Sequence, residues 1–245
     1  IAPGYLADFA IVEDLKDFHV VTVYKRGKRV YHDGIVEDFP LPEIPEHLNK
    51  RAHDTFHLPV LSPADFANTR LRGVIGMVPG QIITQDAGYA ADVDVSKDIL
   101  KMAVVERHKN TRHIGIGYLK GYGLKSGAVA TSVAHDSHNI ICVGTNDEDI
   151  AFAFNRIARN RGGIVVVENG QVLAELPLEI AGIISGKPLQ EVNTLLEDAK
   201  KAAHSLGVGT DIDPFMTLSF MSLPVIPTLR LTTRGVVDVN TQQYV

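Results

Sequence analysis

The stretch Gly127-Ala-Val-Ala-Thr-Ser-Val-Ala-His-Asp-Ser-His-Asn-Ile-Ile-Cys-Val-Gly144 carries a dense polar cluster between two apolar runs. Runs of this length predict buried strands, so residues 135–139 are expected to form the loop that joins them. Two histidines, an aspartate and an asparagine on one loop suit proton transfer or metal binding. A structural turn, whose Asp and Asn bond to their own backbone, explains the same residues. The pattern alone leaves both interpretations open.

Composition limits the classes of function. The chain has 245 residues, 45% hydrophobic residues and a formal net charge of −5, which are ordinary values for a globular protein with one large or two moderate domains. Without a basic excess we expect no nucleic-acid surface. No apolar run approaches the roughly 18 residues of a membrane helix, so we expect no membrane span. The single cysteine, Cys142, lies in an apolar run and indicates a buried thiol in a reducing cytoplasm. The chain opens without Met in strand-like sequence, which suggests a fragment of a longer protein.

Residues 1–35 have a β pattern. Strands are predicted at 7–12, 20–25 and 28–31, with Arg26-Gly27 as the turn of a hairpin. Such a small piece cannot bury its own faces. Residues 36–65 contain five prolines and no sustained period, which is typical of a linker or wrapping segment. His53 and His57 have the spacing of a metal pair on one helix face, but no acidic partner completes a zinc motif.

From residue 66 onward the sequence predicts a second domain. Strands are expected at 71–77, 81–85, 99–105, 164–167, 172–176, 229–231 and 236–239. Helices are expected after Thr145, which with Glu148 has a capping-box pattern, and from Pro188 to Gly207. The glycines between 115 and 127 do not match a dinucleotide or phosphate-binding motif. Strands outnumber helices and hairpins imply antiparallel pairing, so the fold class is α+β, with a mostly antiparallel sheet and helices on one side.

A second polar cluster, Glu106-Arg107-His108, follows the apolar run 99–105. These residues, with Val105, begin a set of motifs that resembles the C-terminal domain of microbial adenine deaminases. The other matching stretches are Gly121-Tyr-Gly-Leu-Lys-Ser-Gly-Ala128, Ala134-His-Asp-Ser-His-Asn139, Leu178-Glu-Ile-Ala-Gly-Ile-Ile-Ser185 and Ser219-Phe-Met-Ser-Leu-Pro-Val-Ile-Pro227. Residues 1–12 and 23–27 resemble the segment that follows the catalytic barrel in amidohydrolases and returns to a small β-sandwich.

This resemblance implies a parent enzyme that hydrolyses adenine to hypoxanthine and ammonia. Members of the family carry two divalent metals, iron or manganese, in an N-terminal barrel, where they generate a nucleophile from water. The His-x-His metal pair of that barrel is absent, because no two of the ten histidines lie two residues apart. We therefore expect the metals outside this chain, none within it, and an inactive chain when it is alone. A barrel partner and a homo-oligomer are also expected.

The two polar clusters are the candidate site. His135, Asp136 and His138 are predicted to act in catalysis, and Asn139 with Glu106, Arg107 and His108 to bind the substrate at the mouth of the barrel. Two alternatives remain: a non-catalytic interaction or oligomerisation domain, and a self-contained metalloenzyme that uses His135, Asp136 and His138 as ligands.

Overall fold

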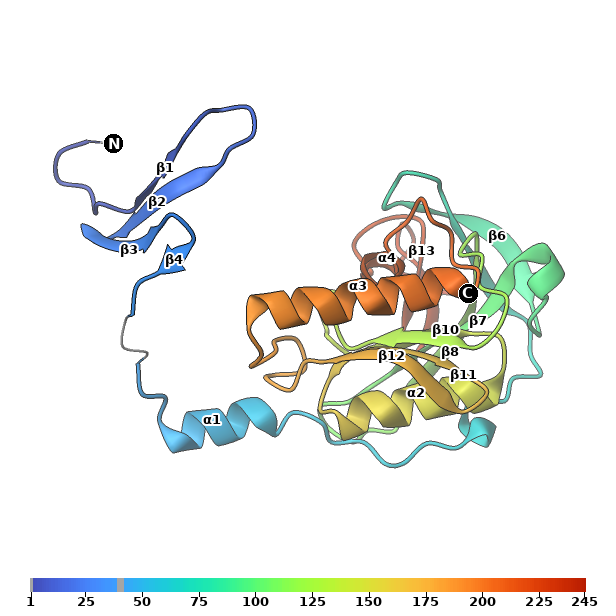
Figure 1. The fold of residues 1–245 in the computed structure, drawn as a ribbon. Helices are drawn as coiled ribbons and strands as arrows, with labels where there is room; N and C mark the ends of the chain where they lie inside the picture. The colour runs from blue at the N-terminus through green and yellow to red at the C-terminus, as the bar shows by residue number, and fades with distance from the viewer. Residues whose placement is uncertain (1, 39–41) are drawn as a thin grey trace. The chain divides into compact units, whose positions relative to one another are not determined.

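The computed structural model describes residues 2–38 and 42–245. It divides the chain into a first unit that ends at Glu46 and a second unit, His47–Val245 (Figure 1). The first unit is one antiparallel sheet in the order β1-β2-β3-β4, with strands β1 (Phe9–Val12), β2 (Val20–Lys25), β3 (Lys28–His32) and β4 (Ile35–Val36). Arg26 and Gly27 have φ values of 51° and 76°, as a type I′ hairpin turn requires. The predicted hairpin is confirmed.

Few side chains are covered in this first unit. Only Thr22 is buried among its described residues. A four-stranded sheet without a second layer leaves both faces open, as the sequence predicted. The assignment of this sheet to an amidohydrolase sandwich stays a prediction.

The second unit is built on an eight-stranded sheet in the order β12-β11-β9-β10-β7-β8-β5-β6. All neighbours are antiparallel except β5 and β8, so the predicted α+β class with a mostly antiparallel sheet is confirmed. The strands are β5 (Arg72–Met77), β6 (Thr84–Ala90), β7 (Ile99–Val105), β8 (Ile114–Lys120), β9 (Ala128–Thr131), β10 (Ile140–Gly144), β11 (Gly163–Glu168) and β12 (Gln171–Pro177).

Helices cover both faces of this sheet, which corrects the prediction that they lie on one side. Helix α2 (Asp147–Arg159) packs on the face that carries Ala103, Ala130 and Cys142. Helices α3 (Leu189–Ser205) and α4 (Pro214–Met221) pack on the opposite face, and Figure 1 shows α2 and α3 on the two sides of the sheet. The physical reason is that the central strands are apolar at consecutive positions, and such strands need a cover on each face.

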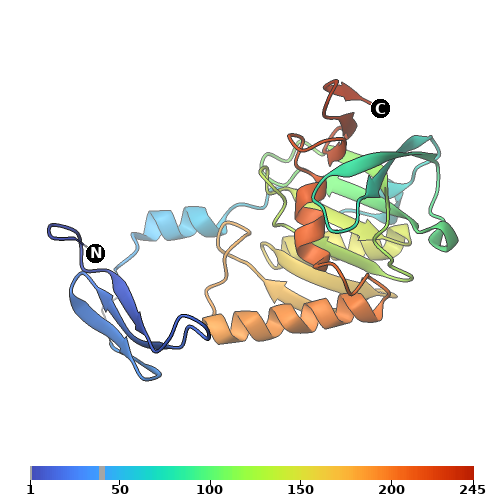
Figure 2. The same ribbon diagram turned by 90° about the horizontal axis from the view of Figure 1, so that it is seen from above.

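Other helices begin or end at different residues than the sequence predicted. The N-cap of α2 is Asn146, whose Oδ1 accepts from the Asp149 amide, and not Thr145. Helix α1 (Glu46–His53) ends before His57, so the two histidines do not share a helix face. Helix α4 lies within a proline-interrupted apolar stretch for which no helix was predicted; it runs crosswise to α3 (Figure 2). The two remaining helical turns are η1 (Pro63–Phe66) and η2 (Val95–Lys97).

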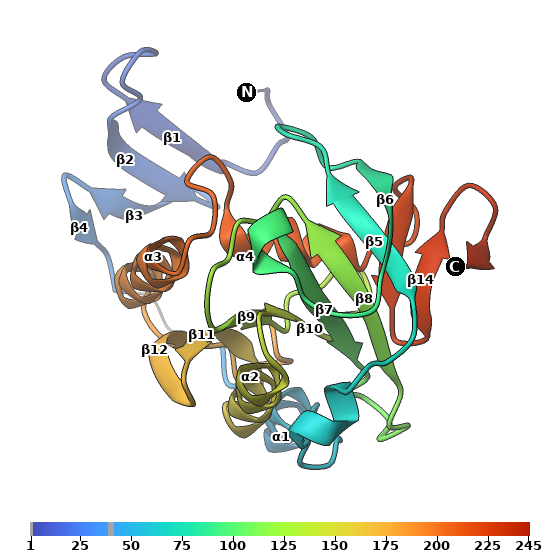
Figure 3. The ribbon, with the colours of Figure 1, turned by 90° about the vertical axis from the view of Figure 1, so that its right-hand side faces the viewer.

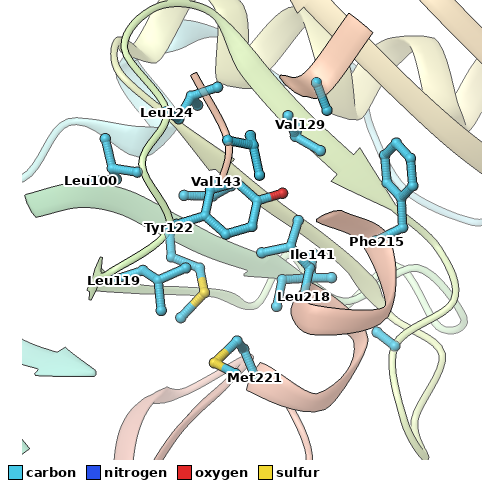
Figure 4. Close-up of a cluster of buried hydrophobic side chains, with 14 of the residues drawn as sticks. Leu100, Leu119, Tyr122, Leu124, Val129, Ile141, Val143, Phe215, Leu218 and Met221 are labelled. Carbon is cyan, nitrogen blue, oxygen red and sulfur yellow. The ribbon is translucent and has the colours of Figure 1, made fainter. Parts of the chain in front are cut away.

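Several predicted elements are confirmed. The strands predicted at 164–167 and 172–176 are β11 and β12, which the Asn169-Gly170 turn joins. The helix predicted from Pro188 to Gly207 is α3, which buries Ala199 and Ala203 against the sheet, together with Leu206 at its C-cap; Val192, Leu195 and Leu196 are partly buried beside them. Cys142 is buried and free. Figure 4 shows part of this core, where Tyr122 lies among apolar side chains and donates its hydroxyl to the Pro214 carbonyl at 3.1 Å.

The C-terminal strands close one end of the core. Strands β13 (Leu229–Thr232), β14 (Gly235–Asp238) and β15 (Gln243–Tyr244) form a small sheet beside β8 (Figure 3). The approach is close, because a Cβ at Gly115 would lie 1.8 Å from the Thr232 carbonyl oxygen. Strands were predicted at 229–231 and 236–239, and the structure confirms them within one residue.

Candidate functional site

The sheet brings the two polar clusters together. Strands β7 and β10 are antiparallel neighbours, and Val105 at the end of β7 is opposite Ile140 at the start of β10. Residues 106–111, called the 106–111 turn below, therefore lie beside residues 135–139, called the 135–139 loop. A hydrogen bond joins the two directly: His108 Nε2 donates to the Ser137 carbonyl at 2.8 Å.

The 135–139 loop holds two of the three buried side-chain polar atoms that have no hydrogen-bond partner in the described parts of the chain. These are His138 Nδ1 and Asn139 Oδ1; the third is Arg230 Nε. Buried polar atoms in native proteins are nearly always paired, so each exception needs an explanation such as a water or a ligand. Two exceptions on consecutive residues mark this loop as the candidate site.

A cavity of about 350 Å³ lies against the loop. Its lining includes Asp136, Ser137 and Asn139 on the loop side, together with 222–225 and 231–233 on the other. Asp136 is exposed and Asn139 is 9% exposed, so the carboxylate lies in the open part of the lining and the amide in the covered part. The volume is within the range of small-molecule sites, which is roughly 300–1,000 Å³.

The two histidines of the loop do not line this cavity. The His135 ring packs against Phe220 at a centroid distance of 5.0 Å and against His138 at 5.9 Å. Burial, reinforced by His135 and Arg107, lowers the pKa of His138 below its ordinary value of 6.5. The ring is therefore neutral at neutral pH, and a neutral imidazole offers one N–H donor and one acceptor.

Arg107 holds the 135–139 loop through a hydrogen bond from its buried side chain. Its side chain is 1% exposed, and its Nε donates to the His138 carbonyl at 2.5 Å. The remaining hydrogen bonds go to Thr55 and to the Ala181 carbonyl. Direct substrate binding by Arg107 stays a prediction; the contacts in the structure are those of a supporting residue.

Glu106 organises the 106–111 turn. Its carboxylate accepts from the amides of His108 and Lys109 at 2.6 and 2.9 Å, and from the amide and hydroxyl of Thr111 at 3.1 and 2.9 Å. Burial acts to raise the pKa of Glu106, but these hydrogen bonds outweigh it and hold the pKa below 4.5. His108 is exposed, so its ring lies at the rim of the cluster.

Acid is therefore expected to loosen this turn. Because the folded pKa of Glu106 is lowered, its stabilising contribution is complete above the ordinary value of 4.5 and is lost as the pH falls through the folded value. Urea unfolding of the protein and of Glu106→Gln between about pH 3 and about pH 6 checks this. The variant should be less stable at the upper end, and the difference should shrink on acidification. A difference that is constant with pH would contradict the assignment.

No metal site is formed by the residues that the structure describes. Nowhere in 2–38 and 42–245 do three His, Cys, Asp or Glu side chains lie close enough together to hold an ion. His135, Asp136 and His138 do not form such a group, and His53 and His57 do not either. In the same residues no helix is both long enough and apolar enough to cross a membrane.

Comparison with known proteins identifies the family. Residues 81–243 match the family described as "Adenine deaminase C-terminal domain". The chain belongs to this family, and the resemblance seen in its motifs is confirmed.

Relatives named adenine deaminase match along the whole chain. The chain is 43% identical over 258 residues to the adenine deaminase of Nitratidesulfovibrio vulgaris strain Hildenborough, covering 100% of this chain and 44% of the relative. It is 42% identical over 253 residues to adenine deaminase 2 of Carboxydothermus hydrogenoformans, covering 98% and 43%. It is 39% identical over 255 residues to the adenine deaminase of Brucella abortus strain 2308, covering 100% and 42%. The chain thus spans less than half the length of these curated relatives.

Proposed function

We propose that this chain is the C-terminal part of an adenine deaminase, which converts adenine and water to hypoxanthine and ammonia. Matches along 98–100% of this chain, at 39–43% identity, to relatives named adenine deaminase support this. In this proposal the chemistry takes place with an N-terminal amidohydrolase barrel, which carries two divalent metals, manganese or iron. The complete enzyme is a cytoplasmic homo-oligomer.

We propose further that the 135–139 loop closes the purine site. One observation carries this: the Asn139 amide lines a cavity of about 350 Å³, and its buried Oδ1 has no hydrogen-bond partner among the described residues, as is also true of the buried Nδ1 of the neighbouring His138. A purine supplies ring nitrogens and an exocyclic amine that such groups recognise. An asparagine amide, for example, matches the donor and acceptor pattern of adenine in nucleic-acid recognition.

In this proposal the residues of the 135–139 loop have different roles toward the purine. The Asp136 carboxylate is exposed at the cavity and is placed to accept a proton or to hold the exocyclic amine. The Asn139 amide offers both donors and an acceptor to the ring, and Ser137 adds a hydroxyl at the same wall. Arg107 and His108 order the loop through their bonds to the His138 and Ser137 carbonyls, and Glu106 orders the 106–111 turn that carries His108.

Metals of the barrel would supply a nucleophile at neutral pH by lowering the pKa of water. This chain's described residues contain no group that fits such an ion, so no step of the proposal uses a metal held by them. The part assigned to this chain is to bind and orient the purine and to keep water out of the closed site.

Asp136→Ala in the full-length enzyme tests the role of the loop. We expect kcat/KM for adenine to fall about 100-fold, the lower end of the effect of a lost general acid or base. Asn139→Leu, which keeps the side-chain volume but removes the amide, should mainly raise KM. The measurement is steady-state deamination with added manganese.

Asp198→Ala is the matched control, because Asp198 is an exposed carboxylate on α3 whose one ion pair among the described residues is with Lys201. Its turnover should equal that of the unaltered enzyme. If Asp136→Ala folds and turns adenine over at the normal rate, the loop has no part in the site, and the domain is an interaction module of the enzyme. If the unaltered full-length protein does not deaminate adenine, the proposed reaction itself is wrong.

A further inference from the structure

Arg107 is a fully buried cation, and no carboxylate in the described part of the chain forms an ion pair or a hydrogen bond with it, although the nearby Glu106 acts to raise its pKa. All four of its hydrogen-bond acceptors are neutral oxygens: the His138 carbonyl, the Thr55 carbonyl and hydroxyl, and the Ala181 carbonyl, at 2.5, 2.7, 3.2 and 2.9 Å. The guanidinium also lies over the Phe56 ring, 4.3 Å from its centroid. Burial lowers the pKa of Arg107 to about 10, which leaves it charged at neutral pH. A buried charge is tolerated only where hydrogen bonds replace its lost hydration, and each of the three guanidinium nitrogens has at least one partner here.

These partners belong to three segments far apart in the sequence. Thr55 follows α1, His138 is in the 135–139 loop, and Ala181 is in the turn after β12. Backbone bonds tie the same segments together: His57 N donates to the Arg107 carbonyl at 2.7 Å, and Ala181 N donates to the Ala52 carbonyl at 2.6 Å. A planar guanidinium can bond several carbonyls in fixed directions, which an ammonium cannot do in the same way.

The bond to His138 has a particular consequence for the loop. His138 has a φ of 48°, in the left-handed region that residues other than glycine seldom adopt. Such a backbone conformation persists only where the surroundings hold it. Two bonds hold it here: His138 N donates to the Ala134 carbonyl at 2.6 Å, and the His138 carbonyl accepts from Arg107.

We propose that Arg107 is the positioning residue of the 135–139 loop, and that it couples the loop to residues 52–57 and to the turn at 180–183. In this role Arg107 never touches the substrate. It sets the direction of the His138 and Asn139 side chains by holding the His138 carbonyl. The coupling stands on the contacts alone; only its effect on turnover rests on the proposed function.

Arg107→Lys tests the proposal, because it keeps the charge and removes the planar fork. The readout is backbone hydrogen exchange along the chain. We expect exchange to become roughly tenfold faster, or more, at 135–139, 52–57 and 180–183 together, since one hydrogen bond to a charged group contributes at least that factor. In the full-length enzyme kcat should fall by up to about 100-fold with a smaller change in KM, as for a misplaced catalytic group.

Arg230→Lys is the matched control. Arg230 is also fully buried, its pKa is likewise lowered to about 10, and its bonds also go to carbonyls, those of Ile82, Pro227 and Leu229. None of these bonds reaches the 135–139 loop. This variant should speed exchange near residues 82 and 227–229 and leave 135–139 unchanged.

Phe56→Leu is a milder second variant, in case Arg107→Lys does not fold. It removes the ring on which the guanidinium rests and deletes none of the hydrogen-bond partners of Arg107, so it acts on the loop only by letting the guanidinium shift. Faster exchange at 135–139 in this variant would show the coupling, because Phe56 belongs to a different segment. Unchanged exchange at 135–139 in the folded Arg107 or Phe56 variant, or an equal rise in Arg230→Lys, would overturn the proposal. If exchange changes as expected but the full-length protein does not deaminate adenine, the coupling stands and the proposed function fails.

Discussion

Gly163→Ala is expected to destabilise the second unit by about 3 kcal/mol or more, through backbone strain and a steric clash together. Gly163 has a φ of 138°, and a Cβ at this position would lie 2.2 Å from the Leu176 carbonyl oxygen. The glycine also exchanges hydrogen bonds with Ser132, whose Oγ accepts from Gly163 N at 2.8 Å. A shift of the backbone would therefore disturb β9, β11 and β12 at once. Urea unfolding followed by circular dichroism measures the loss.

Gly170→Ala is the control on the same hairpin. Gly170 also has a positive φ, 70°, but no heavy atom lies within 4 Å of its added Cβ. The free energy of unfolding should fall by only about 1–2 kcal/mol, the cost of placing an alanine in the left-handed conformation. Equal losses for the two variants would show that conformation and not the close approach decides the effect at Gly163.

Phe154→Ala is expected to cost about 3–5 kcal/mol, the usual range for removing a buried aromatic ring. Phe154 on α2 is fully buried and stacks on Phe66 with ring centroids 5.1 Å apart and planes 7° from parallel. The ring joins α2 to the segment around η1, so its loss opens a cavity between two elements. The measurement is the free energy of unfolding of the variant.

Phe152→Ala is the matched control, with the same substitution on the same helix. Phe152 is only partly buried and packs at the edge of the same cluster. Phe152→Ala should lower the free energy of unfolding clearly less than Phe154→Ala does. A Phe152→Ala loss as large as that of Phe154→Ala would contradict the view that α2 is held mainly through the stacked pair.

The hairpins and α3 were predictable because their signals are local. Asn169-Gly170 sets a turn by its own backbone preferences, and apolar residues recur at helical spacing along the 17 residues of α3. The N-cap of α2 was placed one residue early, because Thr145 and Asn146 are both capping residues and only the packing of α2 chooses between them. Helix α4 was missed because its apolar residues lie all around the helix, so no amphipathic pattern marks it.

The sequence contains enough information to predict helices on both faces of the sheet. All five residues of β10 are buried, which requires a cover on each side of the strand. The two apolar runs of the opening stretch carried this information, and the prediction of one-sided helices did not use it.

For the candidate site, the sequence identified both polar clusters but not what joins them. The two clusters lie side by side because β7 pairs with β10, and this pairing is a non-local contact. The burial of Arg107 also depends on Thr55 and Ala181, 52 and 74 residues away along the chain. Contacts between residues so far apart in the sequence cannot be predicted from local sequence patterns. Residues 222–225 in the cavity wall belong to the 219–227 motif, but their position opposite the loop is another non-local contact that no local pattern predicts.

The small C-terminal sheet has a consequence for synthesis of the protein on the ribosome. Leu229, Leu231 and Val236 belong to the same apolar cluster as α3, α4 and the middle of the large sheet. At roughly 5–20 residues per second, translation makes these side chains many seconds after β5 to β10. Until they emerge, one apolar face of the nascent domain is incompletely covered. A ribosome that stalls before residue 229 therefore leaves this face open to chaperones and proteases for as long as it waits.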